Sequence, residues 1–227
     1  SGVIGGTGLG IAMITFIYSI TNTSAAVTLL CLAAMPFFTA LLGFLFLKEN
    51  ISLNVWIAII IATIGITIIA IGNTEKNSLL GLIFGMTSSI GFSVFSVTLR
   101  WKKETPKFTT VAFAGLFCFV VATIVILTND MVFLSTSYNG ALFSLHGTLV
   151  CMGLILYSIG SKAIPAAELT LLSLTEVIGG IFWVWIPLFG INEIPSTNTI
   201  IGGFFLFMSI IYYSLTIKTN RRFIALN

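Results

Sequence analysis

The chain has 227 residues, of which 57% are hydrophobic and only 7% are charged, and its formal net charge is +3. Soluble domains carry roughly 25% charged residues, so this composition excludes a soluble enzyme or nucleic-acid-binding domain. The three cysteines lie inside apolar stretches without metal-ligand spacing or a paired pattern, so we expect no metal site and no cofactor.

Eight apolar stretches follow one another along the chain, each long enough for a helix that crosses the bilayer core of about 30 Å. In chain order they cover residues 3–20, 24–47, 53–72, 78–99, 108–128, 139–160, 166–189 and 198–217. The connections are short and polar, and no stretch alternates with the period of a barrel strand. The sequence therefore predicts an all-α integral membrane protein with eight transmembrane helices.

Lysine and arginine gather in alternate connections. One set of connections, together with the C-terminal tail, holds nine of the ten basic residues: Lys48, Arg100, Lys102, Lys103, Lys107, Lys162, Lys218, Arg221 and Arg222. The other set holds only Lys76. Because cytoplasmic loops carry an excess of Lys and Arg, we expect a multi-pass protein of the inner (cytoplasmic) membrane with a cytoplasmic C-terminus. An even number of spans places the start of the chain on the same side.

An internal repeat relates two parts of the chain. Residues 25–30 resemble residues 166–171, which lie 141 positions later, and Glu49 corresponds to Glu193 at an offset of 144. The offset of 144 continues through the next helix, in the pairs Ala58 and Gly202, and Gly65 and Ser209. Five helices separate the equivalents, an odd number, so the two copies must cross the membrane in opposite directions. Inverted repeats of this kind are typical of secondary transporters.

The repeated motifs resemble a known family. Residues 47–52 (LKENIS) precede a helix that bears Trp and Gly, and the second copy carries a longer series: residues 164–167, 173–177, 183–185, 192–196 and 201–203. In this order, and doubled with inverted topology, they resemble the EamA type of the drug/metabolite transporter superfamily. The resemblance implies a ten-helix bundle made of two inverted five-helix repeats, with both termini cytoplasmic.

The same resemblance implies a domain organisation. Residues 1–72 would form an incomplete first repeat of three helices, and residues 73–217 the complete second repeat. The first helix of that second repeat and a cytoplasmic loop would lie within 73–107, and residues 218–227 would form a basic cytoplasmic tail. On this reading the chain is an N-terminally truncated part of a longer protein, and we expect that residues 1–227 alone do not transport.

Glu176 is the first candidate for a functional residue. It lies eleven residues after Pro165, or about 16 Å into a helix, which is near the bilayer midplane. An acidic residue there costs roughly 2.5–3.5 kcal/mol, so such residues usually face a cavity or a partner. Thr175 and Trp183 share its helical stripe. Glu176 is then a contact for a substrate cation, a proton-coupling carboxylate, or a protonated side chain bonded to a neighbouring helix.

Two further pairs of polar residues are candidates for lining a substrate pathway. His146 and Tyr157 share one face of the helix at 139–160, which is either a polar packing seam or part of the substrate or coupling site. Ser89 and Ser93 lie on a stripe of small residues in the helix at 78–99. Such stripes usually allow helices to pack closely, and these hydroxyl groups could also line a pathway.

Three residues are candidates for helix-end or gating roles. Pro36 lies in the middle of the helix at 24–47 and removes one backbone hydrogen bond there. Glu49 and Glu193 end symmetric helices at opposite surfaces of the membrane. Capping, local ion pairing and gating by rearranged contacts are all open for these two carboxylates.

The sequence favours a secondary transporter, or permease, that moves a small metabolite by alternating access around a midplane site. The resemblance implies efflux of an amino acid or related compound. The lipid bilayer and a small-molecule substrate are the expected partners, with proton or sodium coupling and a homodimer left open, and we expect no nucleic acid. No P-loop or other nucleotide-binding motif is present, so direct use of ATP is not expected.

Two other classes of protein compete with a transporter. A non-transporting scaffold or membrane subunit is one, but it would leave the midplane carboxylate unexplained and should tolerate Glu176→Leu. An intramembrane enzyme that uses Ser89 and His146 is the other, although the sequence shows neither a nucleophile elbow nor a third catalytic group. We therefore predict that the protein is not an enzyme.

Overall fold

The computed structural model describes residues 1–23, 25–49, 51–72, 79–101, 107–129, 136–185 and 197–225. These residues form helices and no strand: α1 (Gly2–Asn22), α2 (Ala25–Leu32), α3 (Met35–Leu42), the π-helical turn η1 (Gly43–Leu47), α4 (Leu53–Gly72), α5 (Leu79–Trp101), α6 (Lys107–Thr128), α7 (Ser137–Gly160), α8 (Ala166–Leu172), α9 (Leu174–Trp185) and α10 (Thr197–Ala225). Among the described helices, α1, α5, α6 and α7 are long and apolar enough to cross a membrane without interruption. The chain is therefore an all-α, multi-pass membrane protein.

Two stretches for which the sequence predicts one continuous helix are interrupted in the structure. The stretch at 24–47 breaks after Leu32, and α3 begins at Met35 with Pro36 in its first turn. Proline is accepted there because the first turn of a helix needs no amide donor, whereas in a continuous helix its ring would clash with the preceding turn. The stretch at 166–189 breaks at Ser173.

The last helix is longer than the sequence predicts. α10 continues to Ala225, so the basic tail expected from residue 218 begins inside a helix. The prediction ended this helix where basic residues replace apolar ones, but loss of apolar character ends only the part of a helix that suits lipid. Backbone hydrogen bonds can continue beyond that point in the helix itself.

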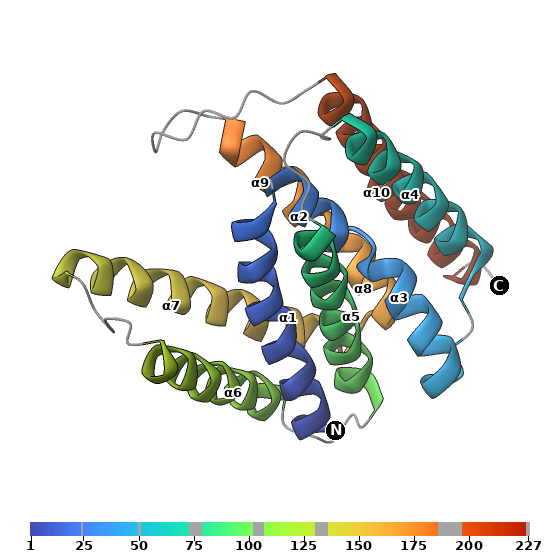
Figure 1. Cartoon of the computed structure of the whole chain (residues 1–227). Coiled ribbons are helices and arrows are strands. Elements are labelled where there is room, and N and C mark those ends of the chain that lie inside the picture. The colour runs from blue at the N-terminus through green and yellow to red at the C-terminus, as the bar shows by residue number, and fades with distance from the viewer. Residues whose placement is uncertain are drawn as a thin grey trace.

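α1 and α5 make the closest helix contact in the bundle, and they run antiparallel side by side (Figure 1). A Cβ atom added at Gly91 of α5 would lie 2.6 Å from the carbonyl oxygen of Gly8, and one added at Gly8 would lie 3.0 Å from that of Gly91. The close approach lets the Ser88 hydroxyl donate to the carbonyl of Ala12 at 2.8 Å. Small residues at such crossings are the usual means of helix association in lipid.

α4 and α10 form a second antiparallel pair, visible at the right of Figure 1. The Ser209 hydroxyl donates to the carbonyl of Ala58 at 2.8 Å, and a Cβ atom at Gly65 would lie 2.6 Å from the carbonyl oxygen of Gly202. Ala58 corresponds to Gly202 and Gly65 to Ser209 at the sequence offset of 144. The two contacts are therefore the same contact seen from either copy, as around a local two-fold axis.

The interrupted helices of the two copies also contact each other symmetrically. At the sequence offset of 141, α8 corresponds to α2 and α9 to α3. In the structure α2 packs on α9 and α3 packs on α8, so each first half contacts the second half of the other copy. Leu29, Leu171 and Leu174 are among the buried side chains that fill this crossing. The two helix breaks thus lie within one central crossing.

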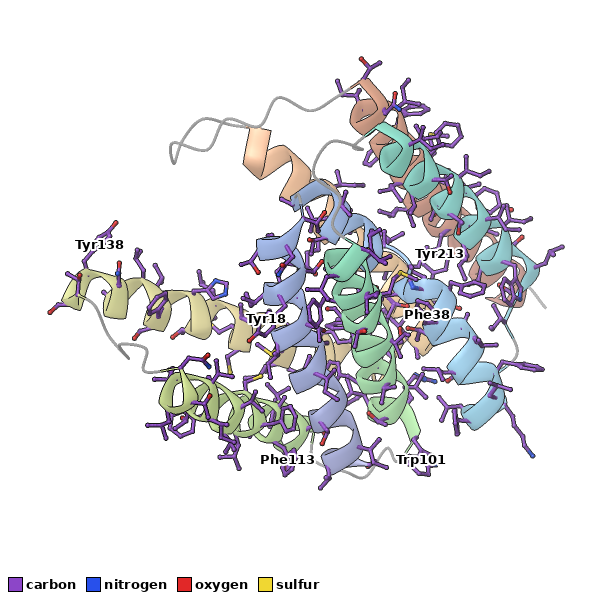
Figure 2. The ribbon with its side chains drawn as sticks, viewed as in Figure 1. Tyr18, Phe38, Trp101, Phe113, Tyr138 and Tyr213 are labelled. Atoms are coloured by element: carbon purple, nitrogen blue, oxygen red, sulfur yellow. The ribbon has the colours of Figure 1, made fainter. Side chains whose placement is uncertain are left out.

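α7 is the least covered helix among those described. Its first half extends away from the other helices, and Tyr138 marks its free end (Figures 1 and 2). Side chains along this half are exposed, including Tyr138, Phe143 and Leu145. Its second half returns to the bundle, where Leu154 and Tyr157 pack on the cluster formed by α1, α5 and α6.

Candidate functional site

Two serines of α5 stabilise the break between α2 and α3. The Ser89 hydroxyl donates to the carbonyl of Cys31, and the Ser93 hydroxyl lies 3.1 Å from the carbonyl of Met35 and 2.8 Å from its own helix at Ser89. Both side chains are fully buried. The hydroxyl groups therefore contact carbonyl groups on either side of the break, and in this structure both are buried between helices.

The second break positions Glu176. The Ser173 hydroxyl donates to the carbonyl of Thr170 at 2.7 Å, and the amide of Glu176 bonds to the carbonyl of Ser173 at 2.9 Å. α9 then starts with Leu174 and Val177 turned into the core, and this leaves the side chains of Thr175 and Glu176 exposed. The carboxylate that the sequence predicts at mid-span is therefore accessible at the start of α9.

Tyr157 of α7 lies within electrostatic range of Glu176. The Tyr157 hydroxyl shares a hydrogen bond of 2.6 Å with the hydroxyl of Ser96 on α5. Its ring meets Phe92 edge-on at 5.2 Å between centroids and stacks on Phe95 at 5.9 Å. The site therefore combines one carboxylate, two hydroxyl groups and a group of packed aromatic rings.

The structure separates His146 from this group. His146 is exposed on the free half of α7, eleven residues before Tyr157, or about 16 Å away along the helix axis. Ser89, which an intramembrane enzyme would need beside His146, is buried between α5 and α2. The side chain of Trp183 and all of Glu193 lie outside the part of the chain that the structure describes.

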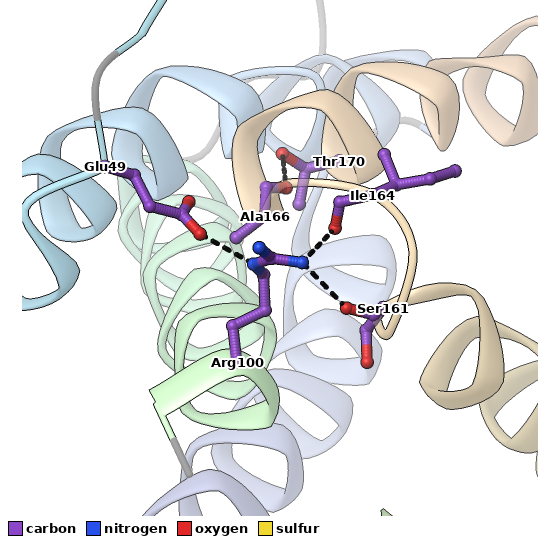
Figure 3. A network of polar contacts seen from close by, with 6 residues as sticks. All are labelled: Glu49, Arg100, Ser161, Ile164, Ala166 and Thr170. Carbon is purple, nitrogen blue, oxygen red and sulfur yellow. Dashed lines mark hydrogen bonds and ion pairs between the residues drawn. The ribbon is translucent and has the colours of Figure 1, made fainter. Parts of the chain in front are cut away.

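One end of the bundle, which we call the basic end, holds Arg100 together with Lys48 and Lys162, the chain neighbours of its partners Glu49 and Ser161. There the Nε atom of Arg100 lies 2.6 Å from Oε1 of Glu49 in an ion pair. Nη1 of Arg100 also donates to the carbonyls of Ser161 at 3.1 Å and Ile164 at 2.8 Å (Figure 3). Sequence reasoning selected Glu49 but missed Arg100, although both were placed on the same side of the membrane.

Glu168 also has a partner that the sequence did not reveal. It lies in the first turn of α8, and the Tyr213 hydroxyl of α10 donates to its carboxylate. Tyr212 reaches the side chain of Asn54 on α4 at 3.4 Å. The tyrosines are adjacent in sequence, so one turn of α10 contacts both α8 and α4. No local signal could have identified these partners, because they lie 45 and 158 positions away.

Comparisons with known proteins identify relatives of the chain. Residues 1–71 match the EamA-like transporter family. An uncharacterized transporter of Helicobacter pylori strain J99 is 33% identical over 95 residues, which cover 42% of this chain and 32% of that protein. A second one, from strain 26695, is 29% identical over 130 residues, covering 57% of this chain and 44% of that protein. The pseudopaline exporter CntI of Pseudomonas aeruginosa is 24% identical over 209 residues, covering 91% and 72%.

A crystal structure of another protein shares the fold, with a TM-score of 0.75 at 17% sequence identity over 94% of this chain and 77% of that one. The chain thus has the fold of a polytopic helical membrane protein with interrupted central helices. Its resemblance to the EamA-type permeases of the drug/metabolite transporter superfamily, drawn from the sequence motifs, is confirmed by the family match and the named relatives. The matches to the Helicobacter pylori transporters span less than half the length of those proteins.

Proposed function

We propose that the protein is a secondary transporter that exports a small metabolite across the cytoplasmic membrane by alternating access. The observation that carries the proposal is the exposed carboxylate of Glu176, at the break between α8 and α9 and within electrostatic range of Tyr157. A scaffold would gain nothing from a costly acidic group at this depth, whereas a substrate or coupling site requires one. The relatives named as transporters and exporter support the same class.

The symmetric contacts support alternating access. α4 pairs with α10, and α2 and α3 pair with α9 and α8, in the way expected of two copies related by a two-fold axis in the membrane plane. Inverted copies can exchange their conformations, so the opening moves from one face of the membrane to the other around a fixed site. Two five-helix repeats in a ten-helix bundle, with the basic end in the cytoplasm, are part of this proposal.

The chemistry of the site favours a substrate that carries a protonated amine. The Glu176 carboxylate supplies a counter-charge, and rings such as Phe92 and Tyr157 can contribute about 0.5–2 kcal/mol of cation–π attraction. Among the described residues, the basic side chain in an ion pair is Arg100, which lies at the basic end and contacts Glu49. An amino acid or related metabolite fits this arrangement, with the amine as the group that Glu176 recognises.

Metabolite export tests the proposal. Cells that express the full natural chain, or its Glu176→Gln or Glu176→Asp variant at matched membrane levels, are compared by profiling amines inside and outside. We expect at least one amine to move outward only with the wild-type protein, to be lost with Gln, and to be partly retained with Asp. Identical profiles for wild type and Glu176→Gln would favour a scaffold and remove Glu176 from the site.

The dependence of export on coupling ions is measured in the same cells. If Glu176 exchanges a proton for the substrate, export by the wild-type protein falls when the proton gradient is collapsed, and the Gln variant shows no such response. If Glu176 only binds the substrate amine, collapse of the proton gradient leaves the difference between the two proteins intact. A sodium-free medium gives the corresponding test for sodium.

A further inference from the structure

We propose that Arg100 is a latch that holds the basic end of the bundle shut by tying the two repeats together. This inference rests on the proposed alternating access, because a latch has meaning only if that end opens. We refer to the contacts of Arg100 with Glu49, Ser161 and Ile164 as the Arg100 latch. Opening toward the basic end would require Arg100 to release Glu49.

The latch joins three separate segments at one guanidinium group (Figure 3). Arg100 lies in the last turn of α5, Glu49 follows η1, and Ser161 and Ile164 belong to the connection between α7 and α8. The Arg100 and Glu49 side chains are only 17% and 23% exposed. A planar guanidinium can hold a carboxylate and two carbonyl groups at once, and a lysine cannot reproduce this geometry.

The backbone before Glu49 is built to present its carboxylate. η1 is a π-helical turn, and Lys48 has a left-handed conformation with φ of 54°. Side chains other than glycine rarely adopt this conformation, and π-helical turns occur frequently at functional sites. The turn closes with a hydrogen bond of 3.3 Å from the Glu49 amide to the carbonyl of Gly43, and a Cβ atom added at Gly43 would lie 3.6 Å from Oε2 of Glu49. Strain of this kind is retained where a precise position matters.

The latch bridges the two predicted copies. Glu49 belongs to the first repeat, whereas Arg100, Ser161 and Ile164 belong to the second. If the repeats rock about the local two-fold axis, contacts between copies near one end cannot persist in both end states. An ion pair between copies at the basic end is therefore specific to the state in which that end is closed.

Exposure of the α8 and α9 side chains agrees with a closed basic end. Ala166 and Thr170, in the helix that begins next to the latch, are 1% and 0% exposed. Thr175 and Glu176, past the break in the same segment, are exposed. In this structure burial thus falls from the half of the segment next to the latch to the half beyond the break, as a closed basic end would require.

The latch can be tested by cysteine labelling of the full chain in lipid vesicles. Thr170→Cys, a substitution of nearly equal volume, reports on the basic end in a background where Cys31, Cys118 and Cys151 are alanine. We expect Arg100→Gln to raise its labelling rate by a membrane-impermeant maleimide roughly tenfold, the equilibrium equivalent of one charge-assisted hydrogen bond. Glu49→Gln should raise it less, because Arg100 keeps its two carbonyl partners.

Two controls separate opening from loss of fold. Arg100→Lys keeps the charge without the fork of donors, and its rate should lie between those of wild type and Arg100→Gln. Cys31 is buried against α5 at 4% exposure, and it is kept as the sole cysteine in parallel samples. Its labelling rate should stay low. If Arg100→Gln accelerates the labelling of Cys31 equally, the substitution has loosened the whole bundle. The labelling rate of Thr170→Cys in the Glu49→Gln variant then decides whether the latch exists. Unchanged Thr170→Cys labelling in folded variants overturns the latch.

A second reporter distinguishes failure of the latch from failure of the proposed transport cycle. With Thr175→Cys as the sole cysteine, alternating access predicts that Arg100→Gln slows labelling, because the site closes on its present side as the basic end opens. Faster labelling at Thr170→Cys with no change at Thr175→Cys would support the latch and contradict alternating access. An unchanged labelling rate at Thr170→Cys would reject the latch. The proposed transport would then be judged from the metabolite profiles.

Discussion

Gly91→Ala should destabilise the bundle through the contact of α5 with α1. The added Cβ would lie 2.6 Å from the carbonyl oxygen of Gly8, and 3.1 Å from the amide nitrogen and 3.2 Å from the Cβ of Ala12. All three are backbone or Cβ atoms, which cannot turn away as a flexible side chain would. The helices must therefore separate by several tenths of an ångström, since real Cβ contacts are rarely this short.

The magnitude follows from two contributions. Overpacking of a well-packed contact costs about 1–3 kcal/mol. Separation of the helices also lengthens the 2.8 Å hydrogen bond from Ser88 to the carbonyl of Ala12, and interhelical bonds in membranes contribute about 0.6 kcal/mol on average. We therefore expect Gly91→Ala to lower the free energy of unfolding by about 2–3 kcal/mol.

The assay is equilibrium unfolding in mixed micelles with increasing dodecyl sulfate, followed by circular dichroism. Gly115→Ala in α6 is the matched control, because a Cβ there has no neighbour within 4 Å. It should be neutral or stabilising by up to about 1 kcal/mol, since alanine is the better helix former. Equal effects of the two substitutions would refute the assignment of a close α1–α5 contact.

Two more predictions concern the interrupted helix and the candidate site. Ser93→Ala should lower the free energy of unfolding by about 1 kcal/mol in the same assay, because it removes a donor to the carbonyl of Met35. Thr39→Val should be neutral or stabilising, because the buried Thr39 hydroxyl has no partner among the described residues. The reverse order would contradict the proposed support of the break. Tyr157→Phe removes the 2.6 Å bond to Ser96 but keeps the ring, so amine export should fall severalfold at an unchanged protein level, and full export would exclude the hydroxyl from the site.

Much of the helix pattern could be predicted because each stretch responds to the bilayer by itself. A run of about 20 apolar residues must satisfy its backbone internally, so its length and composition predict a helix without knowledge of its neighbours. Where the structure describes them, the eight predicted stretches are helical except at the two breaks, residues 33–34 and Ser173. The predicted equivalence of residues 58 and 202, and of 65 and 209, comes from sequence similarity, and the cross-contacts between these positions agree with it.

The interruptions required tertiary information. Pro36 indicated one missing hydrogen bond, but that the helix stops there, with the Ser89 and Ser93 hydroxyls of α5 on carbonyls at either side of the break, is visible only in the structure. The same serines were candidates for lining a pathway because small polar stripes serve packing and transport equally well. Only the position of α2 and α3 against α5 showed which carbonyl groups these hydroxyls contact.

By itself, the sequence determined that the chain lies in a lipid bilayer, that it is helical and that it resembles EamA-type transporters. These properties depend on local composition and on motifs along the chain. Only the tertiary structure decided which polar groups meet. It placed Arg100 on Glu49 and Tyr157 within electrostatic range of Glu176, and it left His146 apart on the free half of α7. Helix partners are chosen by close packing between surfaces distant in sequence, and periodicity within one helix carries no record of that choice.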